Sequence, residues 1–179
     1  TWGQETLYDA IKNSCNYYFY TLALGENPRD GTSLGVKLEL NDIRAAAKQL
    51  GLDQKTGIEI NIPNESSGNI PSVDKKLEII KVMMKKYLDE KLKLFIKEGT
   101  TKSKSQLEED TASLIKLADE NSTISRNDLI DLLDEMGYEA EKIPEGDRAG
   151  LADTLKFTYL NQATWDITDM LNIVIGQGQ

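Results

Sequence analysis

Residues 10–20 read Ala10-Ile11-Lys12-Asn13-Ser14-Cys15-Asn16-Tyr17-Tyr18-Phe19-Tyr20, and this segment sets where the first two helices meet. Apolar residues recur at helical spacing on both sides of it, whereas Asn13, Ser14 and Asn16 favour caps and turns. The pattern predicts helices at about residues 5–13 and 17–25 that join at a tight corner. On one continuous helix, residues two apart point about 200° from each other, but at a corner Ser14 and Asn16 can point the same way. Considered alone, these two residues are more often helix caps than parts of a site.

The composition excludes several classes of enzyme and one class of partner. The 179 residues include no histidine and one cysteine, which excludes a histidine-dependent triad, a His-ligated zinc site and an intrachain disulfide. The 30 acidic and 21 basic residues give a net charge of -9, which argues against a nucleic-acid partner. The 39% hydrophobic fraction is typical of a soluble globular protein, and no segment approaches the roughly 20 apolar residues that cross a bilayer. Any chemistry has to come from Ser, Thr, Lys, Asn, Asp, Glu or Tyr side chains.

The chain divides into three zones by composition. Residues 1–72 mix aromatic residues, glycines and short helical patterns. Residues 73–162 are rich in Lys, Glu and Asp, low in glycine and strongly helical in pattern. Residues 163–179 return to the composition of the first zone. We therefore predict a mainly α chain in which 73–162 is a helical insert with a small core of its own.

Further elements of the first zone follow from turn and cap residues. Glycine, Asn, Pro and Asp over 25–35 predict a loop. Asn41 or Asp42 is expected to cap a helix that runs to Leu50. The strict alternation of residues 57–62 predicts a short extended segment.

Four helices are predicted in the second zone. Apolar spacing indicates a long amphipathic helix over 77–96, whose Leu, Ile and Met stripe is more often core than a partner groove. A capping-box pattern places the start of the second helix at Ser105, and Ser125 starts the third. The fourth is expected at about 145–160, after a proline.

Residues 10–20 resemble the SxN segment of class B penicillin-binding proteins, the peptidoglycan D,D-transpeptidases. Three further blocks continue the resemblance in the same order: Leu50-Gly51-Leu52-Asp53-Gln54-Lys55-Thr56-Gly57-Ile58-Glu59-Ile60, Glu65-Ser66-Ser67-Gly68-Asn69-Ile70-Pro71-Ser72 and Asp169-Met170-Leu171-Asn172-Ile173-Val174-Ile175-Gly176-Gln177-Gly178. The blocks lie in 1–72 and 163–179 and skip 73–162. The resemblance implies the helical lobe of a penicillin-binding transpeptidase (serine β-lactamase-like) fold, with a short extended segment and a helical insert.

The resemblance also implies roles for two residues of the corner. Ser14 looks like the SxN serine, which hydrogen-bonds within the catalytic cluster and helps to pass a proton to the leaving amine. Asn16 looks like the amide that holds the acyl-donor peptide or the side chain of a β-lactam. In this family an activated serine attacks a D-Ala-D-Ala carbonyl and an amine resolves the acyl-enzyme, with a lysine as base. No cofactor and no metal are implied, and the absence of histidine is no obstacle.

The sequence departs from the family pattern at the other two catalytic motifs. The nucleophile of the family lies in an SxxK motif upstream of SxN, and no serine here has that motif in a family-like context. Ser72 and Ser113 fit the bare SxxK spacing, but both follow the SxN segment, so we interpret them as chance matches. Lys55-Thr56-Gly57 spells the third motif, KTG, but its context matches a structural segment, so we do not assign Lys55 a catalytic role.

These departures lead to an expectation for the whole chain. We expect both ends to be cut edges of a longer protein, and the chain to be an internal fragment of a transpeptidase domain. The parent is expected to be an enzyme on the outer face of the bacterial cytoplasmic membrane, acting on stem peptides and binding β-lactams. The chain alone is expected to be soluble and inactive, with no nucleic-acid partner and no membrane contact of its own. The alternative is a non-catalytic interaction module in which 73–162 docks a protein of cell-wall synthesis.

One further motif was weighed and set aside. Residues 119–128 resemble the exit of an EF-hand loop, with Ile124 at the central position. In that alignment Leu117 takes the first ligand position and Ser122 the position that needs glycine, and both are wrong for calcium. We interpret the segment as an acidic helical hairpin with ordinary caps.

Overall fold

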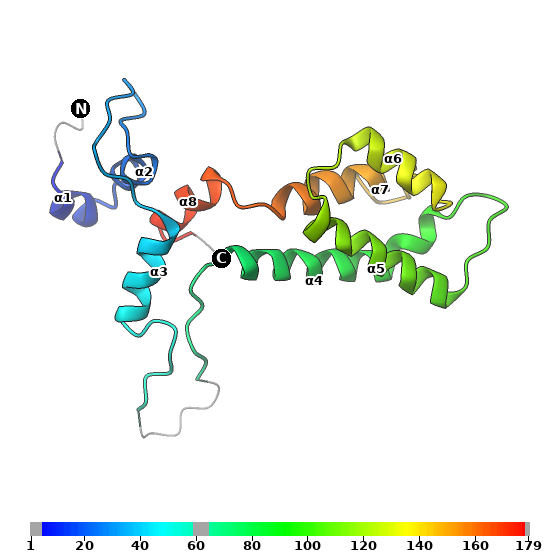
Figure 1. Ribbon diagram of the computed structural model, residues 1–179, viewed down its shortest axis with the longest axis horizontal. Helices are drawn as coiled ribbons and strands as arrows, with labels where there is room; N and C mark the ends of the chain where they lie inside the picture. Colours follow the sequence, from blue (N-terminus) through cyan, green and yellow to red (C-terminus); the bar gives the residue numbers. More distant parts are fainter. Residues whose placement is uncertain (1–4, 59–64, 178–179) are drawn as a thin grey trace. The chain divides into compact units, whose positions relative to one another are not determined.

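The chain forms two compact helical units in a computed structural model that describes residues 5–58 and 65–177. One unit consists of Thr1–Ser72 and Asp166–Gln179, and the other of Val73–Trp165. Nearly all regular structure in the described part is helical, so the prediction of a mainly α chain is confirmed (Figure 1). None of the described helices is long and apolar enough to cross a membrane.

The described part of the first unit contains four short helices, which are α1 (Leu7–Lys12), α2 (Asn16–Leu24), α3 (Leu40–Gln49) and α8 (Ile167–Val174). The predicted corner is confirmed, because only three residues separate α1 from α2. The helix α2 packs against α8, which begins 143 positions after the end of α2 and carries part of the fourth motif block. This contact brings the first and last segments of the chain into one unit.

The start of α3 differs from its predicted position, and the predicted extended segment is only partly described. The helix α3 begins two or three residues earlier than expected, because its N-cap is Glu39 and the Asp42 carboxylate accepts the Glu39 N–H at 3.0 Å. Asp42 therefore serves as the third residue of the helix, where a carboxylate closes the first turn. Most of the predicted extended segment lies at 59–64, outside the described residues.

The second and third motif blocks contact each other through two close approaches. The N–H and hydroxyl of Thr56 donate to Oε1 of Glu65, at 2.7 and 2.5 Å, and these bonds lower the pKa of that carboxyl. A Cβ at Gly68 would lie 1.8 Å from the Leu52 carbonyl oxygen, so only glycine fits there. The Thr56 hydroxyl of the KTG-like segment is thus engaged in local structure.

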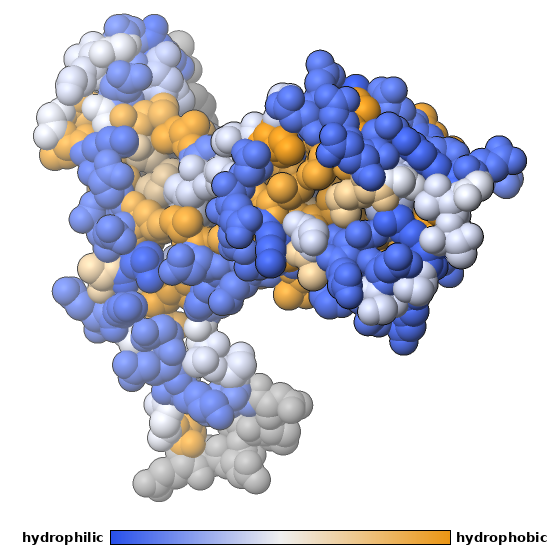
Figure 2. All heavy atoms as spheres, turned by 45° about the vertical axis from the view of Figure 1, so that its right-hand side comes forward, coloured by the Kyte–Doolittle hydropathy of each residue, from blue (hydrophilic) through white to orange (hydrophobic). Residues whose placement is uncertain are grey.

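The second unit contains three continuous helices and a composite fourth. These are α4 (Val73–Lys91), extended by the turn η1 (Leu92–Phe95), then α5 (Lys104–Glu120), α6 (Arg126–Glu135), and α7 (Leu151–Asp153), which continues as η2 (Thr154–Tyr159) and η3 (Leu160–Gln162). A single buried cluster joins all of them, and its fully enclosed members include Met84, Phe95, Leu114, Leu133 and Leu155. Hydrophilic residues cover most of the surface of this unit that Figure 2 shows.

Two helix starts in this unit differ from the sequence prediction. Ser103 is the N-cap of α5 and forms the capping box with Gln106, so the predicted start at Ser105 is wrong by two residues. The fourth helix begins at Leu151 and not at about 145. The segment before it is a loop held by an ion pair between Asp147 and Lys91 at 2.9 Å, and this tertiary contact overrides the local helix signal. The predicted start of the third helix at Ser125 is confirmed.

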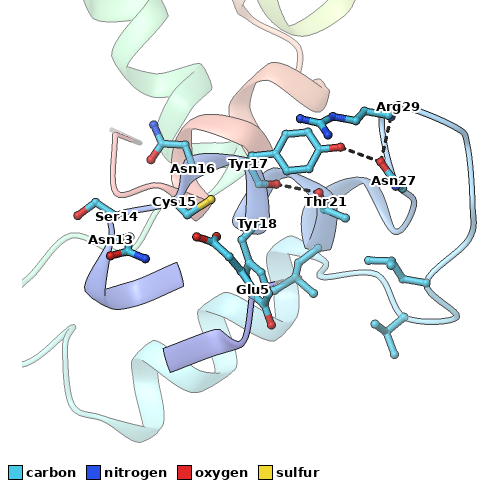
Figure 3. A pocket seen from close by; sticks show the side chains of 13 residues that line it. Glu5, Asn13, Ser14, Cys15, Asn16, Tyr17, Tyr18, Thr21, Asn27 and Arg29 are labelled. Atoms are coloured by element: carbon cyan, nitrogen blue, oxygen red, sulfur yellow. Dashed lines mark hydrogen bonds between the residues drawn. The ribbon is translucent and has the colours of Figure 1, made fainter. Parts of the chain in front are cut away.

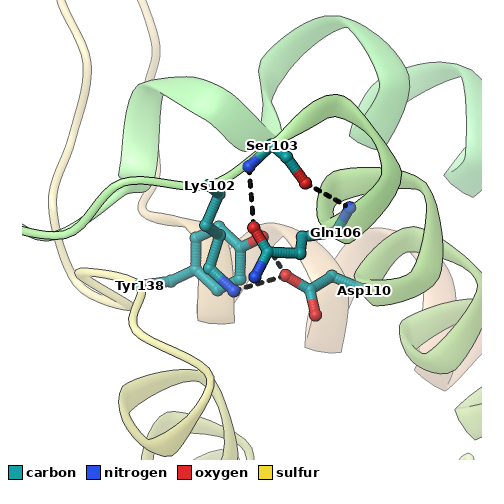
Figure 4. Close-up of polar contacts among 5 residues, drawn as sticks. All are labelled: Lys102, Ser103, Gln106, Asp110 and Tyr138. Carbon is teal, nitrogen blue, oxygen red and sulfur yellow. Dashed lines mark hydrogen bonds and ion pairs between the residues drawn. The ribbon is translucent and has the colours of Figure 1, made fainter.

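A polar network joins the connection before α5 with the connection after α6 (Figure 4). Asp110 on α5 accepts from the Tyr138 hydroxyl at 2.6 Å and pairs with Lys102 Nζ at 2.5 Å. The ammonium also lies over the Tyr138 ring, 4.6 Å from its centre, and Tyr138 itself is fully buried. Burial, together with the nearby Asp110 carboxylate, raises the pKa of Tyr138. A bridge between Ile96 and Tyr138 completes the contact.

Candidate functional site

The corner between α1 and α2 has the geometry of a helix C-terminus that normally requires glycine. The N–H of Cys15 donates to the Ala10 carbonyl at 2.8 Å, and the N–H of Ser14 donates to the Ile11 carbonyl at 3.3 Å. This pair of bonds defines a Schellman motif, in which the residue at the position of Ser14 adopts a left-handed conformation and is usually glycine. Ser14 has φ 51° and is the only non-glycine residue in the described part of the chain with positive φ.

The backbone of Ser14 is strained, and no hydrogen bond of its side chain to a described residue offsets this strain. A left-handed conformation costs an L-residue about 1–2 kcal/mol, and glycine would avoid this cost. The Ser14 side chain is exposed, and its hydroxyl has no hydrogen-bond partner among the described residues. Strained non-glycine residues of this kind cluster at functional sites. This strain makes Ser14 a candidate for a functional residue.

The corner opens onto a pocket of about 770 Å³ in the first unit (Figure 3). Ser14 and Asn16, the two residues predicted from sequence, both line it, together with Cys15 between them. Asn16 is the first residue of α2 and its side chain is exposed. The structure thus places both predicted residues at the wall of one pocket.

The opposite wall of the pocket is a loop fastened to α2 by polar contacts. The Tyr17 hydroxyl donates to Oδ1 of Asn27 at 2.7 Å, and the Arg29 N–H donates to the same oxygen at 3.0 Å. The Arg29 guanidinium lies 5.2 Å from the centre of the Tyr17 ring, a cation–π contact. Arg29 and Asn27 both line the pocket, so the loop presents a cation and an amide to it.

Asp30 holds the turn of this loop. Its carboxylate accepts the Thr32 N–H at 2.9 Å and a hydrogen from the Asn27 side-chain amide at 3.2 Å. The hydrogen bond from the Thr32 backbone is the main cause of the lowered pKa of Asp30. The carboxylate is therefore ionised near neutral pH and fixes Asn27 at the pocket wall.

Sequence reasoning missed several residues of this pocket. Glu5, Asn27 and Arg29 line it, although they lie outside the SxN segment. The Asn-Pro pair at the start of the loop signals a turn, but no periodicity or motif connects that turn with Ser14. Glu5 precedes α1 and carries no sequence signal beyond its charge.

The serines and lysines set aside in the sequence are absent from this pocket. Neither Ser72 nor Ser113 lines it among the described residues, and Ser72 is buried elsewhere in the first unit. Lys55 does not line it, and Arg29 is its only basic residue in the part of the chain that the structure describes. The pocket can therefore orient a polar ligand through hydroxyl and amide groups, but the described residues place no lysine base beside Ser14. No group of three His, Cys, Asp or Glu residues that could hold a metal occurs within 5–58 and 65–177.

Comparison with known families agrees with the motif and the helical fold. Residues 1–126 match the model of the penicillin binding protein transpeptidase domain. The chain belongs to this family of transpeptidase domains. No curated protein and no solved structure matches it.

The residues that match the family model differ from those in the four sequence blocks. It includes 73–126, which the blocks do not reach and which contains α4 and α5. It ends at residue 126 and so does not include the fourth block at 169–178. The SxN segment and both blocks of 50–72 lie inside it.

Proposed function

We propose that this chain is the SxN-bearing part of a class B penicillin-binding protein, a peptidoglycan D,D-transpeptidase. The single observation that carries the proposal is Ser14, a strained serine at a glycine position that lines the same pocket as Asn16. The family match over residues 1–126 supports this assignment. Ser14 and Asn16 are then the serine and asparagine of the SxN motif.

The reaction that we propose is serine acyl transfer. The Oγ of a nucleophilic serine bonds to the carbonyl carbon of the penultimate D-Ala of a stem peptide, and the bond to the terminal D-Ala breaks. Ser14 relays the proton of the nucleophile to the nitrogen of the departing D-Ala. An amine of a second stem peptide then attacks the ester, an amide forms, and the serine regains its proton. Asn16 holds the acyl-donor peptide by its amide throughout, and a β-lactam occupies the same place as the donor.

The nucleophilic serine and its lysine are proposed to lie outside these 179 residues. Within the chain, no SxxK motif stands in a family-like context, and no lysine lines the described pocket. We therefore expect the isolated chain to form no acyl-enzyme. Residues 1–72 and 163–179 are then segments of the transpeptidase helical lobe, with 73–162 as the insert. The whole protein is placed at the outer face of the bacterial cytoplasmic membrane.

Two measurements test this proposal. The whole protein that contains this chain should cross-link a synthetic stem peptide ending in D-Ala-D-Ala and release D-alanine. Asn16→Ala should lower that rate at least tenfold, whereas Asn41→Ala, an exposed asparagine on α3 outside the pocket, should leave it unchanged. A labelled band on the isolated chain after incubation with a fluorescent penicillin and denaturation would contradict the proposed location of the nucleophile.

A second function remains open for residues 73–162, as a module that docks another protein of cell-wall synthesis. The observation that favours it is the self-contained core of the second unit, whose buried cluster includes no residue of the first. Replacing 73–162 by a short linker in the whole protein distinguishes the two. Loss of cross-linking in cells with normal penicillin labelling in vitro would support the docking module, and loss of both would assign the segment to the catalytic fold.

A further inference from the structure

We infer that the pocket beside Ser14 contains a subsite for a primary ammonium group, and that Glu5 is the residue that binds it. In the proposed transpeptidation this group is the amine of the acyl acceptor, so the identity of the ligand rests on the proposed function. The subsite itself rests on the geometry and charge of the pocket.

The Glu5 carboxylate is placed as a binding group and not as a structural one. Its Oε1 is buried but has no hydrogen-bond partner among the described residues. Figure 3 shows the carboxylate pointing toward Cys15 at the corner between α1 and α2. A buried carboxylate oxygen without a donor is costly, and a ligand that brings N–H donors removes that cost.

The charges of the pocket indicate the kind of ligand. Among the described residues that line it, Glu5 is the only acid, and Arg29 lies on the loop that forms the opposite wall. Arg29 is held over the Tyr17 ring and by its backbone to Asn27, so it belongs to the loop and not to Glu5. A primary ammonium has three donors and a full charge, which fits an anionic oxygen that lacks a partner.

The polar residues that share the pocket with Glu5 place such an amine beside the SxN motif. Ser14 and Asn16 line the same pocket as Glu5. An amine that binds Glu5 through one donor is charged, and it becomes a nucleophile only after it gives up a proton. A carboxylate next to the amine can orient it before that proton leaves. Glu5 is therefore a positioning residue for the acceptor.

The lone cysteine of the chain allows a direct test of the charge at this position. Cys15 is partly buried and lines the pocket, so its thiol reports the local potential and the occupancy. The rates of Cys15 modification by a cationic and an anionic methanethiosulfonate are measured on the 179-residue chain and normalised to the rates with free 2-mercaptoethanol. One nearby carboxylate should favour the cationic reagent by about fivefold, and Glu5→Gln should abolish the preference. Glu98→Gln, an exposed residue of the second unit, removes the same charge and should leave the preference intact.

A protection experiment then tests binding of the amine. Nα-acetyl-lysine methylamide should slow the modification of Cys15 by a neutral thiol reagent, whereas the same probe with an acetylated Nε should not. The protection should disappear in Glu5→Gln and persist in Glu5→Asp, which keeps the charge and controls for misfolding. Equal protection by both probes, or equal protection of wild type and Glu5→Gln, would overturn the inference. Ser14→Ala should retain the protection. The protection experiment therefore tests the Glu5 subsite independently of the proposed role of Ser14.

Discussion

Replacing Ser14 by glycine should stabilise the corner between α1 and α2 and abolish its function. The left-handed conformation of Ser14, with φ 51°, costs about 1–2 kcal/mol for an L-residue. Glycine avoids this cost but gives the unfolded chain extra freedom, which costs about 0.5–1 kcal/mol. The hydroxyl has no partner among the described residues, so its removal adds no penalty. The midpoints of these two ranges differ by about 0.75 kcal/mol, which is the expected net gain in stability.

The assay is amide hydrogen exchange of α1 and α2 in the 179-residue chain, because it reports the local stability of these helices in a chain that consists of two compact units. Exchange in Ser14→Gly should be about two- to fivefold slower than in wild type. Ser14→Ala is the matched control, since it removes the hydroxyl but keeps the Cβ and therefore the strain. Its exchange should stay close to that of wild type. Exchange that is faster or unchanged in Ser14→Gly would refute the claim that a serine is strained there, and with it the argument that function keeps the serine.

Three further predictions concern the second unit. Tyr138→Phe removes a 2.6 Å hydrogen bond to Asp110 and should lower the free energy of unfolding by about 1.5–3 kcal/mol, measured by urea denaturation followed by circular dichroism; a midpoint equal to wild type would contradict a contribution from this bond. Leu114→Ala opens a cavity at a fully buried position and should cost about 3 kcal/mol in the same assay, and a loss below about 1 kcal/mol would mean that the core closes around it. The hydrogen bond from Arg126 lowers the pKa of Asp153 below its ordinary value of 3.8, so its stabilising effect is present above that value and lost as the pH falls through the folded pKa. The urea midpoint should therefore fall less between pH 7 and pH 3 in Asp153→Asn than in wild type, and an identical fall would remove Asp153 from the acid response.

Much of the fold was predictable because apolar periodicity is a local signal. The corner at Ser14 followed from a few cap-forming residues between two helical patterns, and the structure confirms it. The start of α5 was predicted at Ser105, whereas the capping box in the structure is formed by Ser103 and Gln106. The structure selects Ser103, beside Lys102 and its contacts with Tyr138, and no local pattern contains that information.

The fourth helix of the second unit shows the same limit more strongly. A proline at 144 is a sound local signal for a helix start, but the chain remains a loop until Leu151. The ion pair between Asp147 and Lys91 joins residues 56 positions apart and fixes the loop. Long-range contacts of this kind decide element boundaries that propensity alone leaves open.

Part of the candidate site could be predicted from a local motif, and part could not. Ser14 and Asn16 could be named because they lie in one short motif with a turn between them. Glu5 and Arg29 could not, because the pocket brings them together from separate segments and neither belongs to a pattern. The unusual φ of Ser14 also has no sequence signal, since serine is not a residue that marks a left-handed position.

The central claim is that Ser14 acts in a transpeptidase site, and the rate of acylation tests it most directly. The measurement is the second-order rate constant for covalent labelling of the whole protein by a fluorescent penicillin. This rate constant is compared among the wild type, Ser14→Ala and Ser67→Ala. Ser67 is an exposed serine of the same unit that lies outside the pocket. Because positioned proton transfer contributes about 10²–10⁴-fold, Ser14→Ala should label at least about 100-fold more slowly, while Ser67→Ala should label at the wild-type rate. Labelling of Ser14→Ala within about twofold of wild type would contradict the account.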